Sequence, residues 1–240
     1  MKKLQRQKGF TLVELAIVLT IIGLLIGGIL KGQQLIANAQ VTAQIAQFKA
    51  IEAAMTTFVD QYQELPGDMK DASTRLPPAC GGAVCGNGGG DGVIGTASAN
   101  PTAITGAATE EMLFWQHLSA ANLIAGVAGT GAVIGQGIPP GKFTGSGMIM
   151  NNLSGGPYIG GAYVSVIGSL AAPVPAAGQG PMTPNQAAQI DRKMDDGQSQ
   201  TGSIVGNGVG GECKGGPAAS GGYDETKPGK DCIVSYHVQN

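Results

Sequence analysis

The chain has 240 residues, of which 41 are glycine and 13 are proline, and only 12% are charged. It is not a charged disordered chain, because such chains combine low hydropathy with high net charge, whereas this one has 42% hydrophobic residues and a formal net charge of −2. No basic patch offers a surface for nucleic acid, so no nucleic-acid partner is indicated.

The first 30 residues join a short basic leader to a long apolar run. Residues 1–9 hold four basic residues and no acid, and residues 10–30 hold a single acid, Glu14. About 20 apolar residues at a rise of about 1.5 Å each span the hydrocarbon core of a bilayer, and basic residues before the span keep that end in the cytoplasm. The sequence therefore predicts a single-pass segment at 10–30. A charge inside such a segment is costly, which makes Glu14 a candidate functional residue.

Two ordinary interpretations of this segment stay open on physical grounds. An uncleaved signal anchor would keep the leader. A secretory signal would be cleaved after small residues, and the nearest weak site is Ala37-Asn38-Ala39. That site lies past the apolar run and inside a helical pattern, which disfavours it.

The junction between leader and span resembles a known sorting signal. The stretch Lys8-Gly9-Phe10-Thr11-Leu12-Val13-Glu14-Leu15, followed by apolar residues, is similar to the type III signal of type IV pilins and type II secretion pseudopilins. The resemblance implies cleavage after Gly9 by a membrane prepilin peptidase, and N-methylation of Phe10. It also implies that Glu14 pairs with the N-terminal ammonium of a neighbouring subunit. Opposite charges attract strongly in a low dielectric, while either alone carries a large desolvation cost, so such a pair would fix the axial register between subunits.

The helical pattern continues beyond the apolar run, through an amphipathic stretch at residues 31–64. Its apolar side chains recur at spacings of three, four and seven residues. They are Val41, Ile45, Phe48, Met55, Val59 and Tyr62, flanked by Ile51 and Phe58. Proline and glycine in Leu65-Pro66-Gly67-Asp68 end the helix. A helix from Phe10 to about Glu64 would be about 80 Å long, and its second half would pack against a globular head at residues 65–240.

The head is predicted to be a small α+β unit with glycine-rich loops. Alternating or β-branched residues predict strands at 161–167 and 232–238, and a third at 147–150. An antiparallel sheet built from them would pack on the long helix. The resemblance implies the same architecture, the pilin lollipop, in which the first half of the long helix spans the membrane.

Two helices are expected in the head, at about 109–123 and 183–194. The first opens with an N-cap threonine followed by two glutamates, which suit the first turn of a helix. On this helix, Trp115 is interpreted as a core anchor rather than a residue that stacks on a ligand. We interpret His117 as a surface residue rather than a metal ligand, because no spacing links it to the other histidine, His237.

The four cysteines would face an oxidising compartment and allow three pairings. Loop closure favours the two local pairs, Cys80–Cys85 and Cys213–Cys232. The second pair also resembles the C-terminal disulfide loop of type IV pilins. A zinc site with four thiolates is the alternative, and it is disfavoured because Cys213 and Cys232 do not form a second short pair.

A glycine-rich loop at 86–94 has the look of a degenerate calcium loop. Asn87 and Asp91 offer side-chain oxygens of the kind that Ca²⁺ prefers. The usual closing glutamate is missing unless Glu110 or Glu111 folds back. A tight turn without an ion is therefore the favoured interpretation, and Ca²⁺ at Asn87 and Asp91 is the alternative.

A second acidic cluster, Asp191, Asp195 and Asp196, lies at the end of the helix predicted at 183–194. We interpret it as a solvated helix end. Acids near a helix C-terminus are unfavourable for the macrodipole, which leaves some room for a cation there.

No catalytic motif occurs in the sequence. It lacks a Gly-x-Ser-x-Gly elbow, a His-Glu-x-x-His helix and a Gly-x-x-x-x-Gly-Lys-Ser/Thr phosphate loop. The chain is therefore interpreted as a protein that is not an enzyme and, calcium aside, needs no cofactor.

The resemblance implies a structural subunit, a prepilin of a type IV pilus or a type II secretion pseudopilus, that polymerises through residues 10–30. The implied partners are the prepilin peptidase, identical or related pilin subunits in a helical filament, and the assembly machinery. The implied location is the bacterial inner membrane, with the N-terminus cytoplasmic, and then a periplasmic or extracellular filament. The alternative is a minor pilin or membrane-anchored adhesin whose head binds a ligand, a surface or a secreted substrate.

Overall fold

The computed structural model describes residues 10–77, 85–104, 106, 109–127, 129, 131–175, 178–208, 211–213 and 222–238. The chain divides into two compact units, residues 1–39 and residues 40–240. In its described part the first unit, called the N-terminal unit below, is the beginning of one long helix. The second, called the head unit, holds the remainder of that helix and the other helices and strands.

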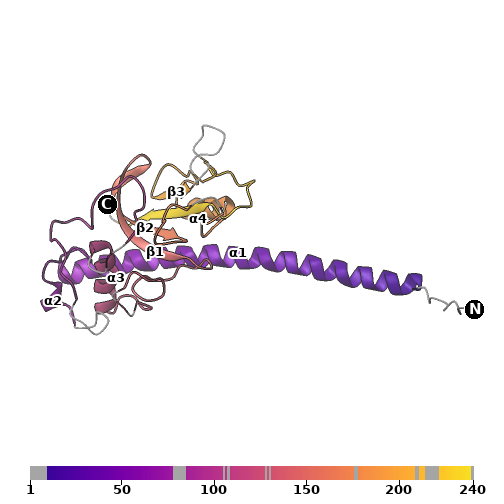
Figure 1. Cartoon of the computed structure of the whole chain (residues 1–240), viewed down its shortest axis with the longest axis horizontal. Helices are drawn as coiled ribbons and strands as arrows, with labels where there is room; N and C mark the ends of the chain where they lie inside the picture. Colours follow the sequence, from indigo (N-terminus) through magenta and orange to yellow (C-terminus); the bar gives the residue numbers. More distant parts are fainter. Residues whose placement is uncertain are drawn as a thin grey trace, which may run out of the picture. The chain divides into compact units, whose positions relative to one another are not determined.

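The long helix, α1, runs from Leu12 to Tyr62 (Figure 1). In the N-terminal unit its large apolar side chains are exposed on every side. They include Leu12, Val13, Leu15, Ile17, Val18, Leu19, Ile21, Ile22, Leu24, Leu25, Ile26, Ile29 and Leu30. This helix is long and apolar enough to cross a membrane. A lone helix that is apolar all round needs lipid or other helices to cover it, in agreement with the span predicted at 10–30.

The other helices all belong to the head unit. They are α2 (Ala72–Arg75), α3 (Glu110–Ala120) and α4 (Pro184–Met194). Helix α3 starts at the predicted cap and ends earlier than expected. Helix α4 follows the prediction closely, because Thr183 and Gln186 form a capping box around a proline at the first turn.

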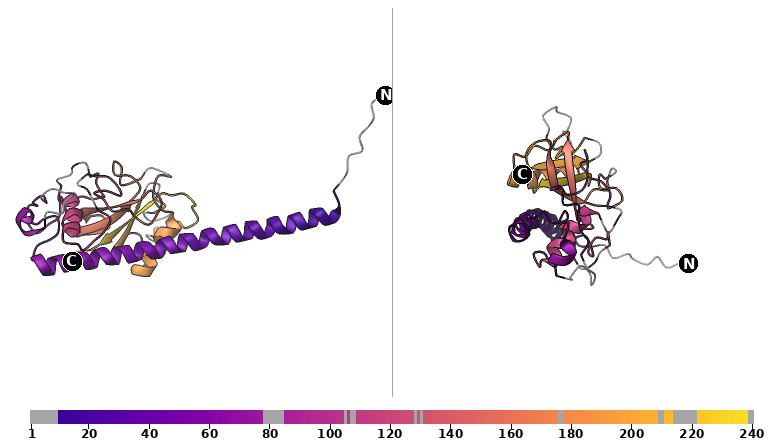
Figure 2. Two further views of the ribbon diagram at one scale, coloured as in Figure 1. Left: turned by 90° about the horizontal axis from the view of Figure 1, so that it is seen from below. Right: turned by 90° about the vertical axis from the view of Figure 1, so that its left-hand side faces the viewer.

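The head unit contains one four-stranded antiparallel sheet, in the order β1-β2-β4-β3 (Figures 1 and 2). Its strands are β1 (Gly147–Gly155), β2 (Tyr158–Ile167), β3 (Ile204–Gly208) and β4 (Cys232–His237). All three predicted strands are present, and β1 and β2 are longer than expected. Strand β3 was not predicted, because a five-residue segment with two glycines carries little strand signal. The long helix and this sheet confirm the α+β class.

The part of α1 in the head unit buries one stripe, as predicted, but its centre is shifted. The buried residues are Val41, Gln44, Phe48, Ile51, Ala54, Met55 and Phe58. Ile51 and Phe58, expected at the flank, lie in the centre, whereas Ile45 and Tyr62 are only partly buried. The stripe includes Gln44, a polar residue that a hydrophobic pattern does not identify. Its side chain is fully buried, and its oxygen is satisfied by the backbone N–H of Lys142, which donates to it at 2.9 Å.

Helix α1 ends slightly earlier than predicted, in a tight turn toward α3. Gln63 adopts a left-handed conformation with φ 58°, and Gly67 follows with φ 93°. A Cβ atom at Gly67 would lie 2.5 Å from the backbone oxygen of Glu110. Only glycine allows this conformation and this approach, so the turn that ends α1 depends on Gly67.

The sheet is buried on both faces. Residues that point to one face belong to the core that the head-unit part of α1 completes; they are Met148, Met150, Val164, Val166 and Val234. Alternate residues pack on the other face with Met112, Ile104 and Ile138; they are Ile149, Ile167 and Ile233. The second face is thus covered by α3 and by loop residues.

Candidate functional site

The N-terminus of α1 is held by a capping box. One carboxylate oxygen of Glu14 accepts hydrogen bonds from the backbone N–H and the hydroxyl of Thr11, each at 2.8 Å. In return, the Thr11 hydroxyl accepts from the backbone N–H of Glu14 at 3.2 Å. Sequence reasoning missed this role, although the Thr-x-x-Glu spacing before an apolar run is its known signature.

The Glu14 carboxylate keeps acceptor capacity beyond the capping box. Its hydrogen bonds with Thr11 involve a single oxygen, Oε2, whereas an ionised carboxylate can accept about four. Phe10, the residue implied to carry the methyl group, is 84% exposed and lies four residues before Glu14 in the chain. Gly9, the implied cleavage residue, lies outside the described residues. The arrangement can therefore offer an anionic acceptor to a cation at the end of an exposed apolar helix.

The glycine-rich loop that contains Asn87 and Asp91 is organised by two carboxylates from other parts of the head unit. Asp68, which is buried, accepts from the backbone N–H groups of Gly90 (2.6 Å), Asp91 (3.0 Å) and Gly92 (2.7 Å). Glu110 accepts from the backbone N–H of Gly89 in the loop at 2.6 Å and from that of Gly95, directly after the loop, at 2.7 Å. The loop thus presents donors inward to the protein's own acids, in the manner of an anion-binding nest.

The two candidate calcium ligands are engaged separately. The side-chain oxygen of Asn87 accepts from the backbone N–H of Ser73 at 2.8 Å, and a carboxylate oxygen of Asp91 accepts from the N–H of Val93 at 3.0 Å. Glu110 does fold back onto the loop, as a closing glutamate would, but it binds N–H groups. Calcium at Asn87 and Asp91 stays a prediction, which unfolding measured with and without Ca²⁺ would test.

Trp115 and His117 both lie inside the head unit. The core position predicted for Trp115 is confirmed, since its side chain is fully buried. The surface position predicted for His117 is wrong, because this side chain is also fully buried. Its Nδ1 accepts from the backbone N–H of Gly67 at 2.9 Å, and its Nε2 lies 2.9 Å from the backbone oxygen of Gly86. His117 therefore ties the turn after α1 to the glycine-rich loop, a role that only the folded chain reveals.

The contribution of His117 to stability is expected to fall as the pH drops from 7 toward 5. Burial holds the pKa of His117 below its usual value of 6.5. Its contribution is therefore complete above pH 6.5 and is lost as the pH falls toward the folded-state pKa, because the unfolded chain takes up the proton first. The measurement is the free energy of unfolding at pH 7 and at pH 5, in the wild type and in His117→Gln.

Glutamine keeps one donor and one acceptor but does not titrate, so the difference between the two proteins isolates the histidine. This comparison is needed because Asp191, described below, acts in the opposite direction. An equal pH dependence in both proteins would contradict the prediction.

One predicted disulfide joins the last strand to the loop before it. Cys213 and Cys232 are bonded, with Cα atoms 5.5 Å apart and a sequence separation of 19. Cys85 is also disulfide-bonded, whereas Cys80 lies outside the described residues. The bond between Cys213 and Cys232 ties the start of β4 to the segment before it, which carries Tyr223 and Glu225.

Replacing Cys213 and Cys232 together with serine is expected to destabilise the head unit by about 3 kcal/mol, since a bond that closes a loop of this length restricts the unfolded chain. The measurement is thermal unfolding of the oxidised variant and the oxidised wild type. A melting temperature unchanged by the double substitution would contradict it.

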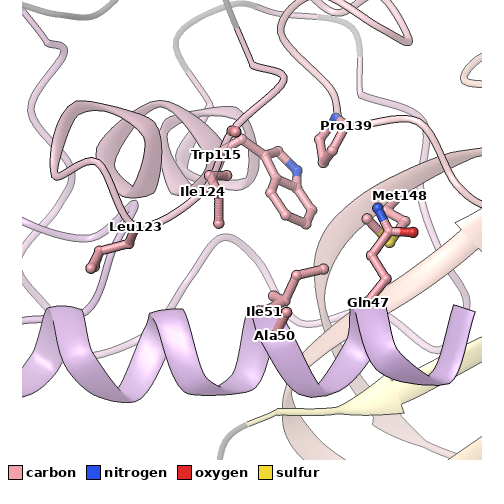
Figure 3. A pocket seen from close by; sticks show the side chains of 9 residues that line it. Gln47, Ala50, Ile51, Trp115, Leu123, Ile124, Pro139 and Met148 are labelled. Atoms are coloured by element: carbon pink, nitrogen blue, oxygen red, sulfur yellow. The ribbon is translucent and has the colours of Figure 1, made fainter. Parts of the chain in front are cut away.

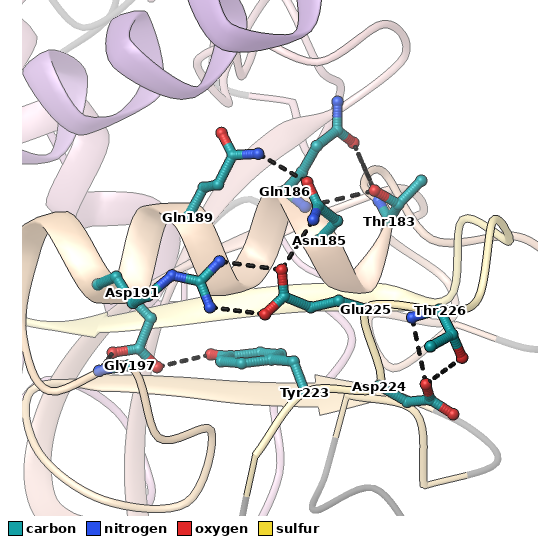
Figure 4. A network of polar contacts seen from close by, with 11 residues as sticks. Thr183, Asn185, Gln186, Gln189, Asp191, Gly197, Tyr223, Asp224, Glu225 and Thr226 are labelled. Atoms are coloured by element: carbon teal, nitrogen blue, oxygen red, sulfur yellow. Dashed lines mark hydrogen bonds and ion pairs between the residues drawn. The ribbon is translucent and has the colours of Figure 1, made fainter. Parts of the chain in front are cut away.

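The acidic cluster of Asp191, Asp195 and Asp196 at the end of α4 is held by hydrogen bonds within the head unit rather than exposed as a whole to solvent. Asp191 is fully buried, and its carboxylate accepts from the Tyr223 hydroxyl at 2.8 Å and from the Gly197 N–H at 2.9 Å (Figure 4). Burial, and to a lesser degree the charges of Asp196 and Asp195, raise the pKa of Asp191 to about 6. The interpretation as a solvated helix end is therefore wrong for Asp191, and it does not describe Asp195 either, which is half-buried and accepts from the backbone N–H of Ile204 at 3.1 Å. It holds for Asp196, which is exposed.

These three carboxylates approach within 4.8 Å of one another, but each already accepts hydrogen bonds from its surroundings. Beside them, Arg192 of α4 and Glu225 form a two-point ion pair at 2.6 and 2.9 Å (Figure 4). The cluster therefore connects α4 to the disulfide-bonded loop, a structural role that accounts for its conformation.

The chain matches one protein family, described as the prokaryotic N-terminal methylation motif, over residues 4–30. This motif is the signal of type IV pilins and pseudopilins. Neither the curated proteins nor the solved structures contain a match to the chain. The match thus covers the junction, Glu14 and the apolar run, and it points to a structural subunit rather than an enzyme.

Proposed function

We propose that this protein, which carries the type IV pilin and pseudopilin signal at residues 4–30, is a structural subunit that polymerises through the apolar part of α1. The filament would be a type IV pilus or a type II secretion pseudopilus. The observation that carries the proposal is the position of Glu14, a single carboxylate at the start of a helix whose apolar residues are exposed on all sides. Assembly would cover that surface and pair that charge.

Processing would prepare the subunit for assembly. Cleavage after Gly9 by a prepilin peptidase removes four basic residues and creates a new ammonium group at Phe10, which is then N-methylated. In a low dielectric, the ammonium of one subunit and the Glu14 carboxylate of the next would stabilise each other, whereas either alone would be costly. The apolar helix would exchange lipid for other helices, so the charge pair sets the register while packing of the helices supplies the contact area.

The location follows from the same features. Before assembly the subunit would lie in the bacterial inner membrane as a single-pass protein with its N-terminus in the cytoplasm. Afterwards it would lie in a periplasmic or extracellular filament with identical or related subunits, placed there by the assembly machinery. If the chain is instead a minor pilin or an adhesin, sheared filaments would contain few copies, whereas a major subunit would dominate them.

The experiment that tests the proposal is the intact mass and N-terminal sequence of the protein taken from the membranes of its native host. A mature chain that begins at methylated Phe10 is the expected result. Retention of residues 1–9, or cleavage near Ala39, would leave an anchored or secreted protein and would remove the basis for assembly through Glu14.

A further inference from the structure

One fully buried acid in the head unit has few groups to balance its charge. The cavity between α1, α3 and β1 is lined by Trp115 and other uncharged side chains (Figure 3). A buried carboxylate, in contrast, needs charge partners or several hydrogen-bond donors. Asp68 has three backbone N–H donors. Asp191 accepts from one backbone N–H, that of Gly197, and from the hydroxyl of Tyr223. Asp191 is thus less well compensated than Asp68, although it is at least as deeply buried.

The charged groups around Asp191 make its ionised form more costly still. Asp195 and Asp196 bring carboxylate oxygens to within 4.8 Å of the oxygens of Asp191. The guanidinium group of the adjacent Arg192 donates to Glu225 at 2.6 and 2.9 Å, so its charge is largely balanced there. Like charges at this distance favour a neutral form of the buried partner. Burial and the two aspartates together raise the pKa of Asp191 to about 6.

Residues 222–227, called the clasp below, cover this carboxyl group. The hydroxyl of Tyr223 donates to Asp191 at 2.8 Å (Figure 4). The ring of Tyr223 lies against Gly206 of β3, where a Cβ atom would be 2.5 Å from Cε1 of the ring. Glu225 binds two side chains of α4, an arginine and an asparagine. The clasp is therefore held on α4 and β3 by side chains, and Tyr223 places its hydroxyl directly on the buried carboxyl group.

We propose that the clasp is controlled by a proton: it is held closed while Asp191 is neutral, and it loosens when Asp191 ionises. A neutral carboxyl group is far less costly to bury, and it can still accept one hydrogen bond and donate another. An ionised one regains solvation when Tyr223 moves away and water reaches it. The disulfide between Cys213 and Cys232 does not titrate, so it is unchanged in either state. The clasp lies within the head unit and does not depend on how the subunit is processed or assembled.

The pH effect on the clasp has a definite direction. With the clasp closed the pKa of Asp191 is about 6, against its usual value of 3.8. A group whose pKa is raised in the closed state favours that state fully below pH 3.8, and this contribution is lost as the pH rises through 6. The equilibrium constant for opening is therefore expected to rise about tenfold between about pH 5 and 7.5. Glu212 acts in the same direction, because its hydrogen bond with Asp231 raises its pKa, and every variant below keeps it.

The experiment is hydrogen–deuterium exchange of the full chain in detergent micelles, followed by mass spectrometry of peptides that cover the clasp. It is done where the clasp closes faster than its amides exchange, so that the rate reports the fraction open. Asp191→Asn is the matched variant, because asparagine stays neutral at every pH. Comparing the two proteins at one pH removes the intrinsic pH dependence of exchange. The ratio of the wild-type rate to the variant rate is expected to be about tenfold higher at about pH 7.5 than at pH 5.

Two further variants separate the proton on Asp191 from other charges. Asp196→Asn removes a neighbouring negative charge, so the rise in the ratio is expected at a lower pH than in the wild type. Asp224→Asn changes a carboxylate of the clasp itself. Hydrogen bonds from Thr226 lower the pKa of Asp224, so it stays ionised throughout, and this variant is expected to keep the wild-type profile.

Three outcomes would overturn the proposal. A ratio that is equal at the two pH values would show that no proton on Asp191 controls the clasp. A ratio that falls as the pH rises would show that the ionised form of Asp191 is the one that closes it. A profile that shifts in Asp224→Asn as much as in Asp196→Asn would show that the effect is not specific to the carboxylates around Asp191.

Discussion

Replacing Glu14 with glutamine is expected to leave a protein that is cleaved normally but does not form filaments. Glutamine keeps a side-chain oxygen that can accept from the N–H of Thr11, so the capping box of α1 can still form. It cannot neutralise the ammonium of a neighbouring subunit. Removing one partner of a buried charge pair costs about 3–5 kcal/mol, which corresponds to a loss of more than about a hundredfold in the association constant.

The measurement is the amount of subunit in sheared filaments relative to the membrane pool, together with the N-terminal sequence of the pool. Glu14→Ala and Glu14→Leu should behave in the same way. Thr11→Val is the control, because it removes the hydroxyl of the box and keeps the charge, and filaments should persist. Normal filaments from Glu14→Gln would count against the register role.

Asp68→Asn is expected to destabilise the head unit by about 1–3 kcal/mol. The wild-type carboxylate is buried and accepts from the N–H groups of Gly90, Asp91 and Gly92. Asparagine replaces one of its oxygens with a donor, so at least one loop N–H loses its acceptor and faces another N–H group. An unsatisfied buried group costs about 1–3 kcal/mol, and hydrogen bonds to a charged acceptor are among the stronger ones.

Urea unfolding of the full chain in detergent would measure the loss. Asp91→Asn is the matched control in the same loop, since Asp91 is exposed and its side chain caps only the nearby N–H of Val93. It should cost less than about 1 kcal/mol. Equal losses in the two variants would show that the loop does not depend on Asp68.

Much of the fold could be predicted because it is encoded locally. The spacing of apolar residues on α1 predicted a buried stripe, and Thr183-Pro184-Asn185 predicted the start of α4. Strand β3 could not be predicted in the same way. It is held by pairing with β4, and its own residues carry little preference for a strand.

The site residues also differ in whether the local sequence reveals them. Glu14 could be identified from the sequence because a charged residue within an apolar run is unusual. The burial of His117 could not, since it depends on Gly67 and Gly86, which are distant in sequence. Likewise, the acid that organises the glycine-rich loop is Asp68, some 20 residues upstream, and no spacing in the sequence links it to the loop.

If subunits assemble as proposed, the capping box also affects how quickly they can join. A glutamate that is free to rotate would lose side-chain entropy when it meets an ammonium group. Glu14 is already held in one conformation by Thr11, so that entropy is lost when the helix forms rather than at the moment of contact. In the proposed filament, each subunit would thus offer a rigid acceptor, and pairing would require only that the ammonium group of a neighbouring subunit reach the axial position of Glu14.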